Sequence, residues 1–138
     1  MTADALAALH ACAFTRLRPW TAQEFSSLLQ SPLVFLYREP HAFALGRAVA
    51  DEAELLTLAT DPDHQRKGYG ATCLKTFEAE ALIRNASRAF LEVDSENFAA
   101  LELYQKAGYE RVGRRKGYYI FADGHITDAI LMVKRLSN

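Results

Sequence analysis

The stretch "ELLTLATDPDHQRKGYGATCLKTF", residues 54–77, decides the fold of this chain. An apolar run typical of a β-strand ends at Thr60, and a turn with two glycines and two basic residues follows it. The next residues favour a helix, with Leu74 and Phe77 on its apolar face. A strand that passes through such a turn into a helix can hold a phosphate group, because the first amides of a helix have no partner within it. A tight turn without a ligand is the alternative interpretation.

The composition indicates a folded domain with a real core. The chain has 138 residues, of which 50% are hydrophobic, and its formal net charge is −1. We expect one domain over residues 1–138, with no direct nucleic-acid partner because a broad basic surface is missing. No apolar stretch reaches the roughly 20 residues that span a bilayer. We therefore expect a cytoplasmic protein without a membrane partner, either a monomer or a weak dimer.

The cysteines and histidines give no sign of a metal site. Cys12 and Cys73 do not form a CxxC pair, and we interpret both as reduced thiols in the core. The four histidines form no cluster in the sequence. We expect no metal.

The hydrophobic pattern predicts an α/β fold. Thr21 and Glu24 have capping-box spacing, so a helix is expected to start there. On the helix after the glycines, Leu74, Phe77, Ala81 and Leu82 are expected to face the core. The expected order is helices at 5–14 and 21–32, strands at 33–37, 42–50 and 54–60, a helix at 71–85, a strand at 88–94, a helix at 97–108, and strands at 109–120 and 127–136.

The strands at 54–60 and 88–94 are joined through a helix. Such a crossover connects parallel neighbours, so we expect a central, mostly antiparallel sheet with one parallel pair, flanked by helices. The glycine turn follows the first of these strands at its carboxyl end. Ligands usually bind there in open α/β sheets.

Glu92 is the first candidate for proton transfer. Along the strand, Ala89, Leu91 and Val93 point to one face, and Glu92 points to the other beside Phe90. A carboxylate among apolar neighbours is partly desolvated, which suits proton transfer near neutral pH. A structural salt bridge is the alternative role.

The helix after this strand places two polar side chains on one face. Asn97 and Tyr104 share a face with Ala100 and Leu101. Asn97 can cap the helix or offer its amide to a ligand. Tyr104 can bring a hydroxyl to the same line, or it can be an ordinary core tyrosine.

Together these stretches resemble a known family. The segment 54–77, the continuation "FLEVDSENFAALELYQKAGYERVGRRKGYY" and the later "DAILM" look like the GNAT N-acetyltransferase superfamily. The likeness covers about residues 18 to 135 and is strongest to the RimI-like branch, the ribosomal-protein alanine N-acetyltransferases. The resemblance implies the GNAT fold and acetyl-CoA as cosubstrate.

The resemblance also implies roles for individual residues. Glu92 is similar in position to the general base of the family, and Tyr104 to its general acid. Trp20, Tyr118 and Tyr119 would line the acceptor site. The backbone of Leu58, Ala59 and Thr60 would pair with the pantetheine arm, and Asn97 would contact its end. The pyrophosphate would lie in the loop of Arg66, Lys67, Gly68, Tyr69, Gly70 and Ala71.

The expected function is therefore acetyl transfer from acetyl-CoA to a protein N-terminal amine. The resemblance points to a small-subunit ribosomal protein as acceptor. Two alternatives are an enzyme of the same class that acetylates a lysine side chain or a small amine, and a non-catalytic acyl-CoA-binding module. Retention of both Glu92 and Tyr104 argues against the second.

Overall fold

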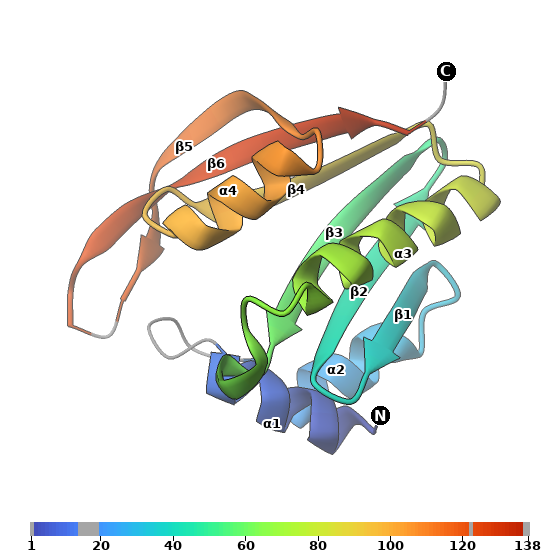
Figure 1. Cartoon of the computed structure of the whole chain (residues 1–138), viewed down its shortest axis with the longest axis horizontal. Helices are drawn as coiled ribbons and strands as arrows, with labels where there is room; N and C mark the ends of the chain where they lie inside the picture. The colour runs from blue at the N-terminus through green and yellow to red at the C-terminus, as the bar shows by residue number, and fades with distance from the viewer. Residues whose placement is uncertain (1, 14–19, 122, 137–138) are drawn as a thin grey trace.

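A computed structural model describes residues 2–13, 20–121 and 123–136. The strands form one sheet, and the helices pack against it (Figure 1). In the described part of the chain, no helix is long and apolar enough to cross a membrane. The elements are α1 (Ala3–Ala13), α2 (Ala22–Leu29), β1 (Val34–Glu39), β2 (Ala42–Val49), β3 (Glu52–Thr60), the short 3₁₀ helix η1 (Pro62–His64), α3 (Tyr69–Ile83), β4 (Arg88–Asp94), α4 (Phe98–Lys106), β5 (Glu110–Ile120) and β6 (Ile126–Arg135).

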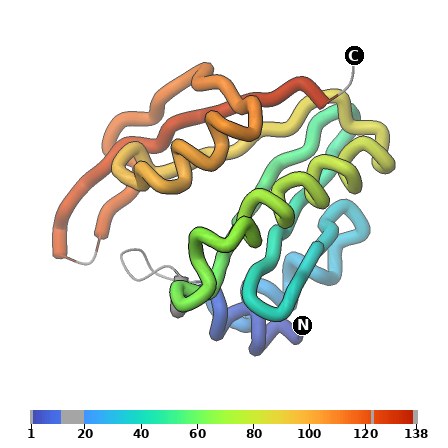
Figure 2. The backbone as a smooth tube through the Cα atoms, in the orientation of Figure 1, coloured from blue at the N-terminus to red at the C-terminus, as the bar shows by residue number. Residues whose placement is uncertain are grey.

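The sheet has six strands in the order β1-β2-β3-β4-β6-β5. β3 and β4 are parallel and all other neighbours are antiparallel, as the sequence predicted. The parallel pairing is short, because it joins only Glu52–Glu54 to Arg88–Phe90. In Figure 2 the ribbon of β5 and β6 continues beyond the end of β4 and curves away from it.

A β-bulge explains why β3 and β4 separate. Opposite β2, Leu45 pairs with Thr57 and Gly46 pairs with Leu55, so Leu56 is an extra residue on β3. An extra residue bends its strand and increases the local twist. The bulge lies just beyond Glu54, where the pairing with β4 ends. The bend therefore opens the sheet from this point on.

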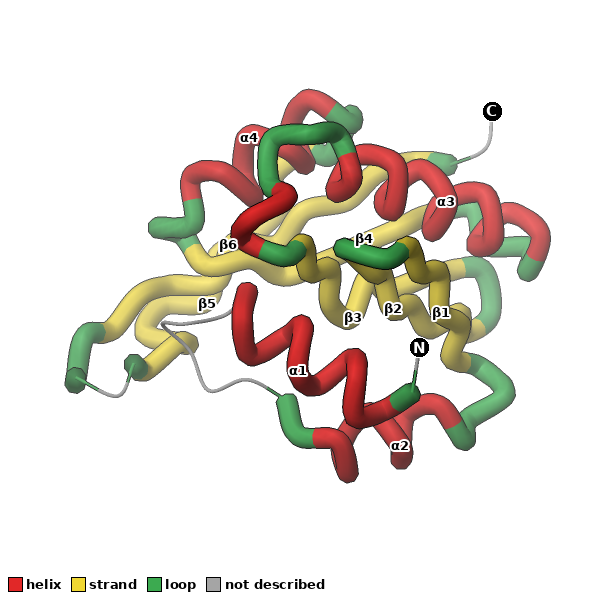
Figure 3. The backbone as a smooth tube through the Cα atoms, turned by 60° about the horizontal axis from the view of Figure 1, so that its bottom comes forward, coloured by secondary structure: helices red, strands yellow, loops and turns green. Residues whose placement is uncertain are grey.

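Helices cover both faces of the sheet (Figure 3). α3 packs on β1, β2 and β3 from one side, while α1 contacts β3 and α2 contacts β1 from the other. The inner face of α3 buries Cys73, Leu74, Phe77 and Ala81, as expected. The expectation for Leu82 is wrong: its side chain is 43% exposed. A residue next to Ala81 lies about 100° further round the helix, which turns it away from the core.

Helix ends agree with the capping signals. Thr21 and Glu24 form the reciprocal capping box of α2, with both hydrogen bonds at 3.1 Å. Asn97 Oδ1 accepts from the Ala100 N–H at the start of α4. α3 begins at Tyr69, two residues before the predicted start, because Gly68 already takes the position of its N-cap. The expectation for Cys12 concerns a side chain outside the described part of the structure.

Candidate active site

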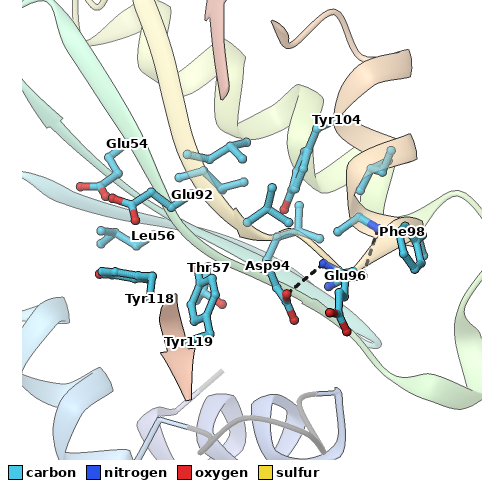
Figure 4. A pocket seen from close by; sticks show the side chains of 18 of the residues that line it. Glu54, Leu56, Thr57, Glu92, Asp94, Glu96, Phe98, Tyr104, Tyr118 and Tyr119 are labelled. Carbon is cyan, nitrogen blue, oxygen red and sulfur yellow. Dashed lines mark hydrogen bonds between the residues drawn. The ribbon is translucent and has the colours of Figure 1, made fainter. Parts of the chain in front are cut away.

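A cleft of about 780 Å³ opens between β3 and β4. Its walls come from β3, β4, the first turns of α4, the end of β5, and His10 and Trp20 (Figure 4). This volume is within the range of small-molecule and cofactor sites. The cleft occupies the space that the bulge at Leu56 creates, so the fold itself produces the opening.

The loop of residues 65–71 lies at the end of this cleft. None of its residues is among those that line the cleft, but Gly70 lies against two that are. A Cβ on Gly70 would lie 3.4 Å from Leu103 Cδ2 and 3.7 Å from Leu58 Cδ2. Because Gly70 has no side chain, the first turn of α3 can pack closely against Leu103 and Leu58.

The loop has the backbone of an anion site. Arg66 and Gly68 have φ values of +66° and +84°, and the first bond of α3 runs from Thr72 N–H to Gly68 C=O. The amides of Tyr69, Gly70 and Ala71 precede that bond and have no acceptor within the helix. A Cβ built on Gly68 would meet nothing within 4 Å, so open space lies beside these amides. Arg66 and Lys67 are exposed next to them.

The backbone of β3 is available along the cleft. Leu58, Ala59 and Thr60 pair with β2 on one edge, and the register with β4 stops at Glu54. The opposite backbone edge of these three residues is therefore not paired with β4. Such an edge can accept an extended ligand as an additional strand.

Glu92 lies in the middle of β4 on the cleft wall. Its side chain is 22% exposed, and its Oε1 lies 3.5 Å from Arg115 on β5. Its Oε2 is buried without a hydrogen-bond partner in the structure. A buried carboxylate oxygen without a donor is costly unless a ligand supplies one. The geometry thus offers an acceptor to a polar group that enters the cleft.

Glu54 is a cleft residue that the sequence reasoning missed. It lines the same wall as Glu92, on the neighbouring strand (Figure 4). Its carboxylate pairs with Arg47 of β2 at 2.9 Å. The only signal in the sequence is an acid near the start of an apolar strand, which is common at strand ends and carries little information.

Tyr104 lines the cleft from α4, and it belongs to the same core cluster as Leu91 and Val93, on the face of β4 opposite to the side chain of Glu92. The side chain of Tyr104 is 7% exposed, and its hydroxyl points from α4 toward β4 (Figure 4). Burial raises the pKa of Tyr104, with a smaller contribution from Tyr119. The hydroxyl therefore stays protonated through the neutral range and can donate a proton. The rings of Tyr104 and Tyr109 meet edge to face, with their centroids 5.9 Å apart, and this contact helps to hold Tyr104 in position.

Tyr118 and Tyr119 close the cleft from β5. Their rings meet edge to face at 5.0 Å, and Tyr118 is 50% exposed. Burial raises the pKa of Tyr119 to about 12, and the charge of Glu92 adds to the shift. Both tyrosines line the cleft, and their expected role in the acceptor site stays a prediction.

Trp20 lines the cleft together with a histidine that the sequence reasoning did not single out. The backbone N–H of Trp20 donates to His10 Nδ1 at 3.0 Å, and the two rings stack with their centroids 5.4 Å apart. His10 is 3% exposed, on α1. A single histidine in an apolar helix gives no sequence signal that it lines a cleft.

The other histidines contradict the expectation that none of them cluster. His41 and His64 stack with ring centroids 3.5 Å apart, beside Asp61. The turn between β1 and β2 brings His41 to the end of β3, where Asp61 begins η1. His41 is distant in the sequence from Asp61 and His64, and the fold brings the three residues together.

Comparisons with known proteins agree with this architecture. The model of the acetyltransferase (GNAT) family matches residues 4–109. The ribosomal protein bS18-alanine N-acetyltransferase of Escherichia coli is 34% identical over 140 residues, which cover 99% of this chain and 94% of that protein. The crystal structure of the ribosomal-protein-S18-alanine N-acetyltransferase from Escherichia coli has a TM-score of 0.87 at 32% identity, over 99% of this chain and 88% of that one. Arabidopsis thaliana NAA60 in complex with acetyl-CoA has a TM-score of 0.81 at 16% identity, over 96% and 92%, and shows the fold alone.

Three features agree with an acyl-transferring enzyme: the separation of β3 from β4, the cleft between them, and the N-terminus of α3 at the end of the cleft. This chain belongs to the acetyltransferase (GNAT) family, and it is an acetyl-CoA-dependent N-acetyltransferase. The predicted fold class and the predicted family are both confirmed.

Proposed function

We propose that this enzyme acetylates the N-terminal α-amine of a protein, and that the acceptor is a small-subunit ribosomal protein with an alanine terminus. The observation that carries the proposal is that Glu92 on β4 and Tyr104 on α4 line one cleft. The name of the 34% identical relative supports the choice of acceptor. We further propose a single-domain, cytoplasmic enzyme, monomeric or weakly dimeric, whose chemistry needs no metal.

Acetyl-CoA would lie along β3. The open edge of Leu58, Ala59 and Thr60 would bond the pantetheine amides as a strand does, and the amide of Asn97 would meet the end of this arm. The pyrophosphate would rest on the first amides of α3, with Arg66 and Lys67 beside it. The open space at Gly68 supports this placement.

Glu92 would act as the general base. An α-amine attacks only in its neutral form, and its ordinary pKa is about 7.7–8.0. Glu92 would take its proton, directly or through a water molecule. The Oε2 atom without a partner supports this role, because an incoming amine would supply the missing donor.

The thioester would be activated from β3 and the thiolate protonated from α4. A backbone amide near Leu58 would hold the oxyanion that forms on the carbonyl. The sulfur of coenzyme A then leaves with the bonding electrons, and Tyr104 would give it a proton. The raised pKa of Tyr104, caused by burial, keeps that proton in place until the thiolate forms.

The acceptor peptide would enter between Trp20 and the tyrosine pair Tyr118 and Tyr119. All three side chains line the cleft. The half-exposed ring of Tyr118 supports a contact with a peptide, because an exposed aromatic ring offers apolar area at low entropic cost.

A peptide panel tests the proposal. Purified enzyme and acetyl-CoA are mixed with an alanine-terminated ribosomal peptide, the same peptide with a blocked terminus and one lysine, and a small primary amine. Mass spectrometry then locates the acetyl group. Acetylation of the free terminus supports the proposal. Preference for the lysine or the amine would move the acceptor to another class, and cosubstrate binding without transfer to any of them would indicate a non-catalytic module.

The role of Glu92 has a matched control in the same cleft. Glu92→Gln keeps size and hydrogen bonding but cannot take the proton. The rate relative to the unmodified enzyme should be lowest at low pH, where the amine is protonated, and should recover as pH rises through about 8. Glu54→Gln removes a neighbouring carboxylate that is already paired with Arg47, and its relative rate should not vary with pH. A Glu92→Gln ratio that is constant across pH would mean that Glu92 only positions the amine.

A further inference from the structure

A second cluster of chemical groups lies outside the catalytic cleft. His41, Asp61 and His64 meet at the end of the sheet where β3 leads into the loop of residues 65–71, and none of them lines the cleft. One ligand atom from each residue, two ring nitrogens and a carboxylate oxygen, lie within 4.8 Å of one another. We propose that these three residues form a binding site for a divalent metal ion, for which Zn²⁺ is the best-suited probe.

The backbone holds the three residues in place before any ion binds. The Asp61 N–H donates to the His41 carbonyl at 2.8 Å, and the His64 N–H donates to the Asp61 carbonyl at 2.8 Å. Asp61 Oδ1 accepts from the Asp63 N–H at 3.0 Å and so caps η1. This leaves Asp61 Oδ2 as the ligand oxygen, at 3.6 Å from His64 Nδ1.

His64 Nδ1 is the second observation that points to a ligand. This atom is buried and has no hydrogen-bond partner in the structure. At 3.6 Å, the contact with Asp61 is too long for a good hydrogen bond. A buried polar atom without a partner requires an explanation, and a bound ion is one of the standard ones.

The donor set fits zinc. Two imidazoles and one carboxylate are ordinary zinc ligands, and a site with three protein ligands keeps its fourth position for water. Zinc–nitrogen distances of about 2.0–2.1 Å place tetrahedral ligand atoms roughly 3.3 Å apart. The stacked rings must therefore rotate to bring their nitrogens together. The side chains of His64 and Asp61 are 28% and 32% exposed, which leaves room for that rotation.

The position of the site gives it a structural consequence. The ion would tie the β1–β2 turn at His41 to η1, two residues before Arg66. The ring of Tyr69, at the start of α3, lies 6.0 Å from the His41 ring and 6.3 Å from the His64 ring. The metal would thus brace one end of the loop from outside, without contact to the reacting groups.

Calorimetric titration tests the proposal. The full chain, without a histidine tag and stripped with a chelator, is titrated with Zn²⁺ at pH 7.5, and Co²⁺ absorption reports the coordination geometry. We expect one saturable site and a tetrahedral Co²⁺ spectrum. His64→Ala should weaken binding by more than the roughly 10–100-fold that loss of an outer partner costs. Asp61→Asn should also weaken it, and asparagine can still cap η1, so folding is preserved.

His125→Ala is the matched control. His125 bonds Glu96 at 2.9 Å on another part of the molecule, so its loss should leave zinc affinity unchanged. Thermal unfolding with and without zinc confirms that each variant folds, and zinc should raise the melting temperature of the unmodified protein but not of His64→Ala. Absence of saturable binding, or equal affinity in His64→Ala and the unmodified chain, would overturn the proposal.

Discussion

Replacement of Gly68 by alanine separates backbone strain from ligand contact. Gly68 has a φ of +84°, and a Cβ at this position meets nothing within 4 Å. The methyl group therefore adds no clash within the protein. It adds only the strain of a left-handed residue, about 1–2 kcal/mol in the free energy of unfolding. Gly124, in the β5–β6 turn, provides a matched control because its φ is +89° and its Cβ position is equally open.

The two variants should differ in their affinity for acetyl-CoA. Gly68→Ala and Gly124→Ala should lose a similar amount of stability, measured by urea unfolding. In Gly68→Ala the new methyl group stands where the pyrophosphate is expected, and relief of the strain moves the adjacent amides. A loss of about 1.4 kcal/mol in binding corresponds to a tenfold weaker Kd, and we expect at least that. Gly124→Ala should bind acetyl-CoA normally.

Isothermal titration calorimetry with acetyl-CoA measures the affinity of both variants. A folded Gly68→Ala variant whose affinity equals that of Gly124→Ala would refute the placement of the pyrophosphate. Unequal stability of the two variants would show that the strain at these positions is not comparable, and the affinities would then be compared at equal folded fraction.

Three other changes probe the acid, the core and a surface carboxylate. Tyr104→Phe should lower turnover by roughly 10²–10⁴-fold with little change in acetyl-CoA affinity, and an unchanged rate in steady-state kinetics would assign the proton to another group. Gly46→Ala should cost about 1–3 kcal/mol in urea unfolding, because its Cβ would lie 2.6 Å from Phe77 Cε1. Asp128→Asn should destabilise the protein by its full amount above the ordinary aspartate pKa of 3.8, since the Gly117 N–H lowers the pKa of Asp128. That difference should vanish as pH falls through the lowered pKa, and unfolding at several pH values measures it.

Local sequence patterns predicted the elements well. The alternation in β4 and the capping box at Thr21 depend on neighbours within a few residues, so the sequence contains the whole signal. The parallel pairing of β3 and β4 followed from the crossover through a helix. The position of Tyr104 in the cleft followed from the helical spacing that it shares with Asn97.

Contacts between distant segments were not predictable in the same way. The bulge at Leu56 depends on how β2 pairs with β3, and nothing in the strand's own residues marks it. The stack of His41 on His64 needs both the β1–β2 turn and the start of η1. Because side-chain periodicity describes faces and not partners, such pairs appear only once the tertiary structure is known.

The short contact between β3 and β4 makes the enzyme divisible. The chain passes from the half with β1, β2 and β3 to the half with β4, β5 and β6 through a single turn after α3, where Asn85 is exposed. A cut at Asn85 would leave the loop of residues 65–71, the proposed pyrophosphate site, on one fragment and Glu92 with Tyr104 on the other. Neither fragment would hold a complete set of reacting groups, and a cosubstrate that spans both would favour their reassembly by mass action. If acetyl-CoA binds as proposed, we expect the two fragments to act as a split sensor whose recovered activity depends on acetyl-CoA.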